Sequence, residues 1–189
     1  REGIERGGSV HRRGTKALSE REGGSGGVFA RRVESIAQSE GRVIVYGVGK
    51  SGLVGRKIAA TLTSTGTPAT FLHPADSVHG DLGIVGKSDV AILISKSGES
   101  ADLLGLLDHL KRLGVCTIAL TSNAKSTLAR HSEVALDGWV KEEACPHDLA
   151  PTTSTTVALA LGDALAIALL EEKGFNAADF ARIHPGGSI

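Results

Sequence analysis

The 189-residue sequence contains no methionine, few aromatic residues (3%) and no net charge. Because Lys and Arg total 21 and Asp and Glu also total 21, no basic field is available to attract nucleic acid or an anionic membrane surface. The scarcity of aromatic rings also argues against a surface on which bases stack. The composition therefore excludes both partners and predicts that any anion is bound by a local site.

Neither a membrane span nor a secretory signal is predicted. The longest apolar stretch, Val157 to Leu170, is interrupted by Gly162 and Asp163 and falls short of the roughly 20 residues that cross a bilayer. We interpret it as a core helix. The N-terminal arginines are not followed by an apolar region, and the lack of methionine fits a fragment or a processed form.

Two cysteines are too few for a framework of disulfides. Cys116 lies in an apolar, strand-like run and Cys145 in a polar loop. We interpret both as reduced thiols, which predicts a cytoplasmic protein.

The length fits one domain, and its organisation follows from the apolar pattern. Residues 1–27 contain eight glycines and many charges without apolar periodicity, so we expect a flexible segment there and one domain over 28–189. Strands are expected at 43–46, 69–72, 90–94, 115–120 and 134–136, and helices at 53–64, 100–113, 154–172 and 177–181. This alternation indicates an α/β fold, a three-layer αβα sandwich around a mainly parallel five-stranded sheet.

The loop from Ser95 to Ser100 is the clearest candidate for a phosphate site. Its serine hydroxyls, Gly98 and backbone N–H groups precede a helix, whose positive dipole end favours an anion. In parallel sheets, ligands bind beyond the carboxyl ends of the strands, where this loop lies. An ordinary helix cap with spare serines is the alternative, but three serines around one glycine exceed what capping requires.

Three other segments carry weaker signals. The loop Gly47 to Gly52 fits neither the nucleotide P-loop nor the dinucleotide fingerprint. The segment from His73 to Asp81 has two histidines and two aspartates at a strand end, but its spacing matches no standard zinc pattern. Glu142 and Glu143 precede a hydroxyl-rich helix start at 152–156, where a carboxylate can serve as a base or simply lie at the surface.

Seven motifs occur in order between Gly41 and the last residue. They are Gly47-Val48-Gly49-Lys50-Ser51-Gly52, Ser64-Thr65-Gly66-Thr67-Pro68, His79-Gly80-Asp81-Leu82-Gly83, Ser95 to Ser100, Glu143-Ala144-Cys145-Pro146, Leu149-Ala150-Pro151-Thr152 and His184-Pro185-Gly186-Gly187. Together they closely resemble the D-arabinose 5-phosphate isomerases of the SIS (sugar isomerase) domain superfamily, whose fold is flavodoxin-like. The resemblance implies interconversion of D-ribulose 5-phosphate and D-arabinose 5-phosphate through a cis-enediol, on the route to the Kdo sugar of lipopolysaccharide, with no required cofactor.

The resemblance also implies roles for particular residues. Lys50, Glu143 and His184 match three of four catalytic positions, and we assign Glu143 as the proton-shuttling base, His184 to ring opening or proton transfer, and Lys50 to stabilising the enediolate. The fourth position is a glutamate in the family and Asp102 here, and the shorter side chain costs as much as about a hundredfold if its placement matters. Substrate contacts are expected from Ser51, Gly66, Thr67, His79, Ser95, Ser97, Ser100 and Thr152, and a divalent metal contact from His73.

In SIS proteins the terminal histidine usually reaches a neighbouring subunit, which implies a homotetramer with shared active sites. Many relatives continue into a pair of CBS regulatory domains, and we expect none within these 189 residues. Two alternatives remain open, another SIS sugar-phosphate isomerase and a non-catalytic SIS domain that senses sugar phosphates. A sensor of this kind usually follows a helix-turn-helix, of which the first 40 residues show no pattern.

Overall fold

The computed structural model describes Val33 and residues 36–187, and it contains a five-stranded, all-parallel sheet. The strands are β1 (Val43–Gly47), β2 (Ala69–Leu72), β3 (Val90–Ile94), β4 (Cys116–Thr121) and β5 (Val134–Asp137). Their order in the sheet is β2-β1-β3-β4-β5, so the direction of winding reverses between β1 and β3. In such doubly wound sheets, that reversal opens a crevice at the carboxyl ends of the two strands.

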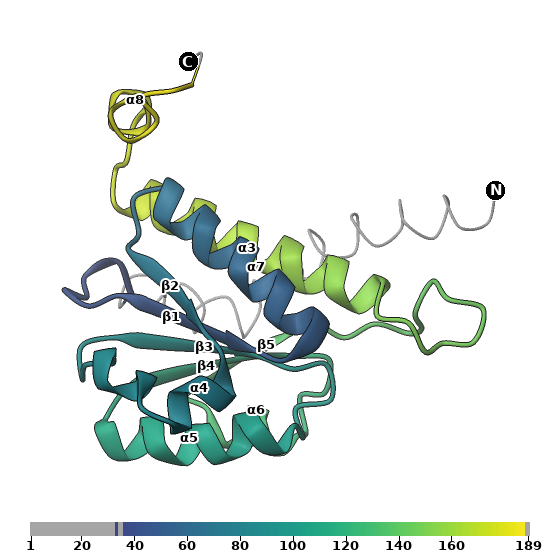
Figure 1. Ribbon diagram of the computed structural model, residues 1–189. Coiled ribbons are helices and arrows are strands. Elements are labelled where there is room, and N and C mark those ends of the chain that lie inside the picture. The colour runs from purple at the N-terminus through teal and green to yellow at the C-terminus, as the bar shows by residue number, and fades with distance from the viewer. Residues whose placement is uncertain (1–32, 34–35, 188–189) are drawn as a thin grey trace, which may run out of the picture.

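Helices cover both faces of the sheet (Figure 1). On one face lie α3 (Gly49–Ser64) and α7 (Thr153–Glu172), and on the other lie α4 (Pro74–Val78), α5 (Ala101–Leu113) and α6 (Thr127–His131). A short 3₁₀ helix, η2 (Asp81–Ile84), follows α4, and α8 (Ala177–Ile183) is the last helix of the described residues. The three-layer arrangement and the parallel sheet confirm the predicted fold class.

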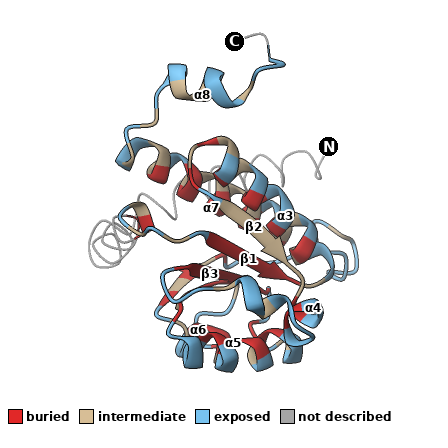
Figure 2. Ribbon diagram, turned by 60° about the vertical axis from the view of Figure 1, so that its left-hand side comes forward, coloured by how far each residue is buried: buried red, intermediate tan, exposed pale blue. Residues whose placement is uncertain are grey.

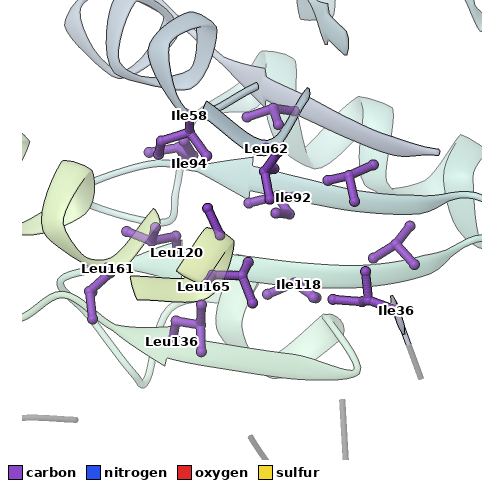
Figure 3. Packing of buried hydrophobic residues seen from close by; sticks show 14 of the residues in the cluster. Ile36, Ile58, Leu62, Ile92, Ile94, Ile118, Leu120, Leu136, Leu161 and Leu165 are labelled. Atoms are coloured by element: carbon purple, nitrogen blue, oxygen red, sulfur yellow. The ribbon is translucent and has the colours of Figure 1, made fainter. Parts of the chain in front are cut away.

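The strands form close to where they were predicted, and the two central ones are buried on both faces. All five residues of β1 and all five of β3 are buried, as expected of central parallel strands (Figure 2). Alternate residues of each strand enter two cores. Ile92 and Ile94 pack with Ile58, Leu62, Leu161 and Leu165 beneath α3 and α7 (Figure 3), while Ile44 and Leu93 pack under α5. Fully burying each of these side chains contributes about 1.5–3 kcal/mol.

Helix α7 is the predicted core helix, although its length and composition alone would also allow it to cross a membrane. Its residues Leu161, Leu165 and Leu169 are buried in the core. Gly162 lies so close to α3 that an added Cβ would be 2.3 Å from a carbon of Ile58. This close packing identifies α7 as a structural helix of the domain, with an outer side that stays partly exposed.

Two local predictions were wrong. Helix α3 begins at Gly49 rather than Leu53, so Lys50 and Ser51 belong to its first turn and not to a loop. The segment between His73 and Asp81 is not a loop but contains α4 and the start of η2. Tertiary packing, of α3 against β1 and β2 and of α4 against α5 and η2, overrides the low helix propensity of glycine, serine and aspartate. The flexible segment predicted for 1–27 lies outside the described residues.

Candidate active site

A cavity of about 160 Å³ lies at the carboxyl edge of the sheet, beside the reversal between β1 and β3. Residues from both central strand ends, from the first turns of α3 and α7 and from β4 line it: Val48, Lys50, Ser51, Val54, Ile94, Lys96, Leu120, Thr121, Ser122, Gly138, Pro151, Ser154, Thr155 and Ala158. Two lysines therefore face one small cavity with mostly apolar walls. This charge suits an anionic ligand.

Behind this cavity, the Glu143 carboxylate is held by the start of α7. Its Oε2 accepts hydrogen bonds from the backbone N–H groups of Thr152 (2.9 Å) and Ser154 (3.1 Å), and its Oε1 accepts from the Ser154 hydroxyl. The N-terminus of a 20-residue helix adds a favourable dipole. The Glu143 backbone N–H donates to the Asp148 carboxylate at 2.6 Å, which fixes the loop that carries it.

Lys96 completes the surroundings of Glu143. Its Nζ lies 2.7 Å from Glu143 Oε1, and the Glu143 side chain is 0% exposed while that of Lys96 is 47% exposed. Burial raises the pKa of Glu143, but the hydrogen bonds from Lys96, Ser154 and Thr152 outweigh burial and lower the pKa to about 2. Glu143 is therefore a buried, ionised carboxylate in this structure.

The predicted phosphate loop adjoins the cavity. Gly98 adopts a φ of 68°, its N–H donates to Ser95 Oγ at 3.1 Å, and the Glu99 N–H donates to Ser97 Oγ at 3.2 Å. The Ser100 side chain makes no capping bond to α5, so the simple capping alternative does not account for it. Ser95, Ser97 and Ser100 do not line the cavity, and the loop reaches it through Lys96.

Other predicted residues at this edge are dispersed. Lys50 and Ser51 line the cavity, and Thr152 binds Glu143 through its N–H and its hydroxyl. Asp102 lies exposed in the first turn of α5, away from the cavity lining, and His79 is exposed just after α4. The structure thus brings Lys50, Ser51, Thr152 and Glu143 together and leaves Asp102 and His79 apart.

The predicted metal contact, His73, makes a local contact in this chain. Its Nδ1 accepts a hydrogen bond from the Ala75 N–H at 3.3 Å and so caps α4. Across Val33 and residues 36–187, no three His, Cys, Asp or Glu side chains are grouped closely enough to hold a metal ion. The described residues around His73 therefore do not fit a divalent metal.

Three predicted residues lie elsewhere in the domain. Gly66 and Thr67 follow the end of α3 and precede β2, so they lie at the amino edge of the sheet, opposite the cavity. An added Cβ on Gly66 would be 2.3 Å from the Phe175 ring, and the buried Thr67 hydroxyl has no hydrogen-bond partner. His184 follows α8, whose residues are all at least partly exposed and which stands apart from the sheet (Figures 1 and 2).

His184 is nevertheless ordered by local contacts. Its Nδ1 lies 2.8 Å from the Phe180 carbonyl oxygen, and its ring stacks on Phe180 with centroids 3.8 Å apart. It borders an open hollow beside β2 that also includes Arg56, Ser64 and Phe71. One chain therefore does not bring His184 to the cavity that adjoins Glu143.

Sequence reasoning missed two residues of the Glu143 site, Lys96 and Ser154. Lys96 lies within the serine loop, and its position between two candidate anion-binding serines was a usable signal. Ser154 was visible only as one of several hydroxyls at a helix start. Its role depends on the folding of the 138–152 segment, which no local pattern specifies.

Known proteins are similar to this chain in both sequence and fold. Residues 35–168 match the SIS domain family. The chain is 56% identical over 161 residues to arabinose 5-phosphate isomerase KdsD of Pseudomonas aeruginosa and 55% identical over 164 residues to the Francisella tularensis protein of that name. Each match covers 85% of this chain but only 49% and 50% of those proteins. The chain thus spans about half the length of these curated relatives.

A solved structure agrees over nearly its whole length. An Escherichia coli protein, solved in complex with arabinose 5-phosphate, superposes with a TM-score of 0.83 at 43% identity, covering 96% of this chain and 95% of that one. The predicted resemblance is confirmed by sequence and by fold, and the chain belongs to the SIS domain family.

Proposed function

We propose that this chain catalyses the isomerisation between D-ribulose 5-phosphate and D-arabinose 5-phosphate, which supplies a precursor of the Kdo sugar of lipopolysaccharide. The names of the two bacterial relatives and the E. coli relative solved in complex with arabinose 5-phosphate support this reaction. The single observation that carries the proposal is the buried Glu143 carboxylate beside a cavity that two lysines line.

The reaction requires only acid–base groups. A base takes the proton from the carbon beside the aldehyde while the carbonyl oxygen gains one, which gives a cis-enediol. Return of a proton to the former aldehyde carbon and loss of one from the second oxygen gives the ketose, so no atoms or electrons are gained or lost. We assign the carbon-to-carbon transfer to Glu143 and the stabilisation of the developing enediolate charge to Lys50, which lies in the first turn of α3.

Phosphate binding is assigned to the loop from Ser95 to Ser100 together with Ser51. The positive ends of α3 and α5 and the two cavity lysines all favour a dianion at this edge. Thr152 positions Glu143 through its N–H and hydroxyl, in addition to the substrate contact assigned to it. No step is assigned to a metal ion at His73, because the residues there do not fit one, and we propose that no cofactor is required.

We further propose a homotetramer in which neighbouring chains share active sites. His184, assigned to ring opening or proton transfer between oxygens, lies away from its own chain's cavity, together with Gly66 and Thr67. Helix α7 is apolar around its circumference, yet less than half of its apolar stretch is buried within one chain. Both features favour a second copy that covers α7 and receives α8. His79 and Asp102, exposed at the carboxyl edge, are assigned to the same completed site.

A cytoplasmic location is proposed because Cys116 and Cys145 are interpreted as reduced thiols. Their reduced state was predicted from the sequence, and the location itself remains part of the proposal.

The test is to incubate the protein with D-ribulose 5-phosphate and to follow D-arabinose 5-phosphate by a chromatographic assay. Turnover is expected without added metal or cofactor. Binding of the sugar phosphate without turnover would instead favour the sensor, and turnover of a different ketose phosphate alone would favour another SIS isomerase.

A further inference from the structure

The proposed base does not reach the cavity in this structure. The Glu143 side chain is 0% exposed and is not among the lining residues, whereas Lys96 and Ser154, which both bind its Oε1, line the cavity. A base must come within about 3–3.5 Å of the carbon whose proton it removes. One of the two intervening side chains therefore has to move before Glu143 can act.

Ser154 is poorly suited to move. Both its N–H and its hydroxyl bind Glu143, it lies in the first turn of α7, and it is buried. Rotation of its hydroxyl would break a buried hydrogen bond to Oε1, and its N–H, which the helix fixes in place, would still hold Oε2. The barrier between Glu143 and the cavity that can open is therefore Lys96.

Lys96 combines a fixed backbone with an adjustable head group. Its carbonyl oxygen accepts bonds from the Ser122 N–H (3.0 Å) and the Thr121 hydroxyl (3.1 Å), which tie it to the end of β4. Its side chain is 47% exposed and has four flexible methylene groups. The ammonium can therefore change partners while the loop stays in place.

The adjacent loop supplies the reason for a change of partner. Lys96 lies between Ser95 and Ser97, in the loop to which we assign the substrate phosphate. A phosphate monoester carries up to two negative charges and forms strong charge-assisted hydrogen bonds with an ammonium group. A lysine held by one carboxylate thus meets a more highly charged anion when substrate binds.

We propose that Lys96 is a positioning residue that couples phosphate binding to base release: its ammonium holds Glu143 until the substrate phosphate draws it away and opens Glu143 to the sugar. This inference rests on the proposed function, because it takes Glu143 as the base and the serine loop as the phosphate site.

The electrostatics at Glu143 agree with this role. Other charged groups close to Glu143 are Asp148, which binds its backbone N–H, and Lys50, across the cavity. Among the groups that counter the effect of burial, Lys96 contributes most to the low pKa of Glu143. Withdrawal of Lys96 therefore raises that pKa, and a carboxylate with a higher pKa is a stronger base.

The direct test follows the ionisation of Glu143 by carboxyl ¹³C NMR of the whole chain, with D-arabinose 5-phosphate, with unphosphorylated D-arabinose or with neither sugar. Without ligand, Glu143 should stay ionised to the acid limit of folding. Saturating arabinose 5-phosphate should raise its apparent pKa by roughly 1 pH unit or more, and arabinose should leave it unchanged.

Two variants distinguish a change in the Glu143 pKa that depends on Lys96 from a direct effect of the phosphate charge. Lys96→Met should raise the pKa of Glu143 before ligand is added and should remove most of the ligand-dependent rise. Lys57→Met is the matched control, since Lys57 also pairs with a carboxylate (Asp163, 2.6 Å) and is equally exposed at 48%. It should leave the Glu143 titration unchanged. If Lys96→Met fails to fold, the wild-type titration still decides.

Kinetics give a second readout. In the wild type the acid limb of the kcat profile, which reports the complex, should give Glu143 a pKa roughly 1 pH unit or more above the value titrated by NMR without ligand. Lys96→Met should bring these two values together. A lysine with a purely structural role would change both values equally or neither.

The proposal is overturned if arabinose 5-phosphate does not bind, if it leaves the pKa of Glu143 unchanged, or if it raises that pKa equally in Lys96→Met. These outcomes are distinct from failure of the proposed function. A ligand-dependent rise that Lys96→Met abolishes, in a protein that does not interconvert the two sugars, would support the coupling and refute the isomerase.

Discussion

The two edges of the parallel sheet differ in how completely one chain builds them. At the carboxyl edge, the Glu143 carboxylate accepts hydrogen bonds at the start of α7, pairs with Lys96 and lies behind a small cavity. Toward the amino edge and beside β2, Thr67 keeps a buried hydroxyl without a partner, and His184 borders only an open hollow. One chain therefore forms a cavity beside a buried carboxylate at the carboxyl edge, and it leaves Thr67 and His184 outside that cavity.

In the proposed homotetramer, the two regions meet across subunits. His184 is ordered by Phe180 rather than by the sheet, so α8 presents it as a preformed unit. An ordered histidine loses little conformational entropy when it docks. Single variants can therefore test each region by itself, and mixed oligomers of two variants can test whether the regions act together.

The largest effect is expected at the carboxyl edge. Glu143→Gln keeps the size of the side chain and an acceptor for the Thr152 and Ser154 bonds, but it removes the base. We expect kcat to fall by about 10²–10⁴-fold while KM changes only a few fold. Steady-state kinetics on arabinose 5-phosphate measure both. Glu142→Gln, an exposed neighbour, is the control, and near-normal turnover by Glu143→Gln would refute the assignment.

The carboxyl edge was also the easier region to predict from sequence. The runs 43–46 and 90–94 are apolar throughout, which only strands buried on both faces require, and the loops after them must lie at one edge of a parallel sheet. The placement of the serine loop and of Lys50 at this edge follows from that rule. The pairing of Lys96 with Glu143 does not, because the residues lie 47 positions apart in sequence and their contact depends on how the 138–152 segment folds.

The position of Gly66 and Thr67 at the amino edge could also have been predicted from the order of helices and strands. Gly66 and Thr67 follow a helix and precede a strand, so parallel topology alone puts them at the amino edge, away from Lys50. The first turn of α3 and helix α4 were missed for another reason. Glycine and serine in Gly49 to Gly52, and aspartate and serine in α4, are weak helix formers, so local propensity favoured loops there.

The second prediction tests whether His184 and Glu143 from different chains act in one site. His184→Ala should lower kcat by about 10²-fold or more, since it removes a proton-transferring group. If sites are shared between pairs of chains, co-expression of His184→Ala with Glu143→Gln should restore activity, because each mixed pair contains one intact site. Random pairing gives about one quarter of the wild-type activity. Purified mixed assemblies report it in the isomerase assay.

Two controls complete this experiment. Each variant expressed alone should keep only its low residual activity, and sedimentation should show an oligomer in each case. No recovery in a mixed oligomer, or a fully active monomer, would place His184 and Glu143 in the same chain's site or remove His184 from catalysis.

The smallest effect is expected at the serine loop, and it tests whether this part of the carboxyl edge binds phosphate. Loss of one hydrogen bond to a charged group costs about 1.5–3 kcal/mol, so Ser97→Ala should raise KM about tenfold or more with little change in kcat. Ser95→Ala should do the same and also leave the buried Gly98 N–H without its acceptor, which lowers thermal stability.

Ser132→Ala, which loses one hydroxyl bond to Leu128 at the end of α6, controls for the loss of a serine hydroxyl away from the cavity. Unchanged KM in both loop variants would leave Lys50 and Lys96 as the phosphate ligands, and the serines would then serve only to shape the turn at Gly98.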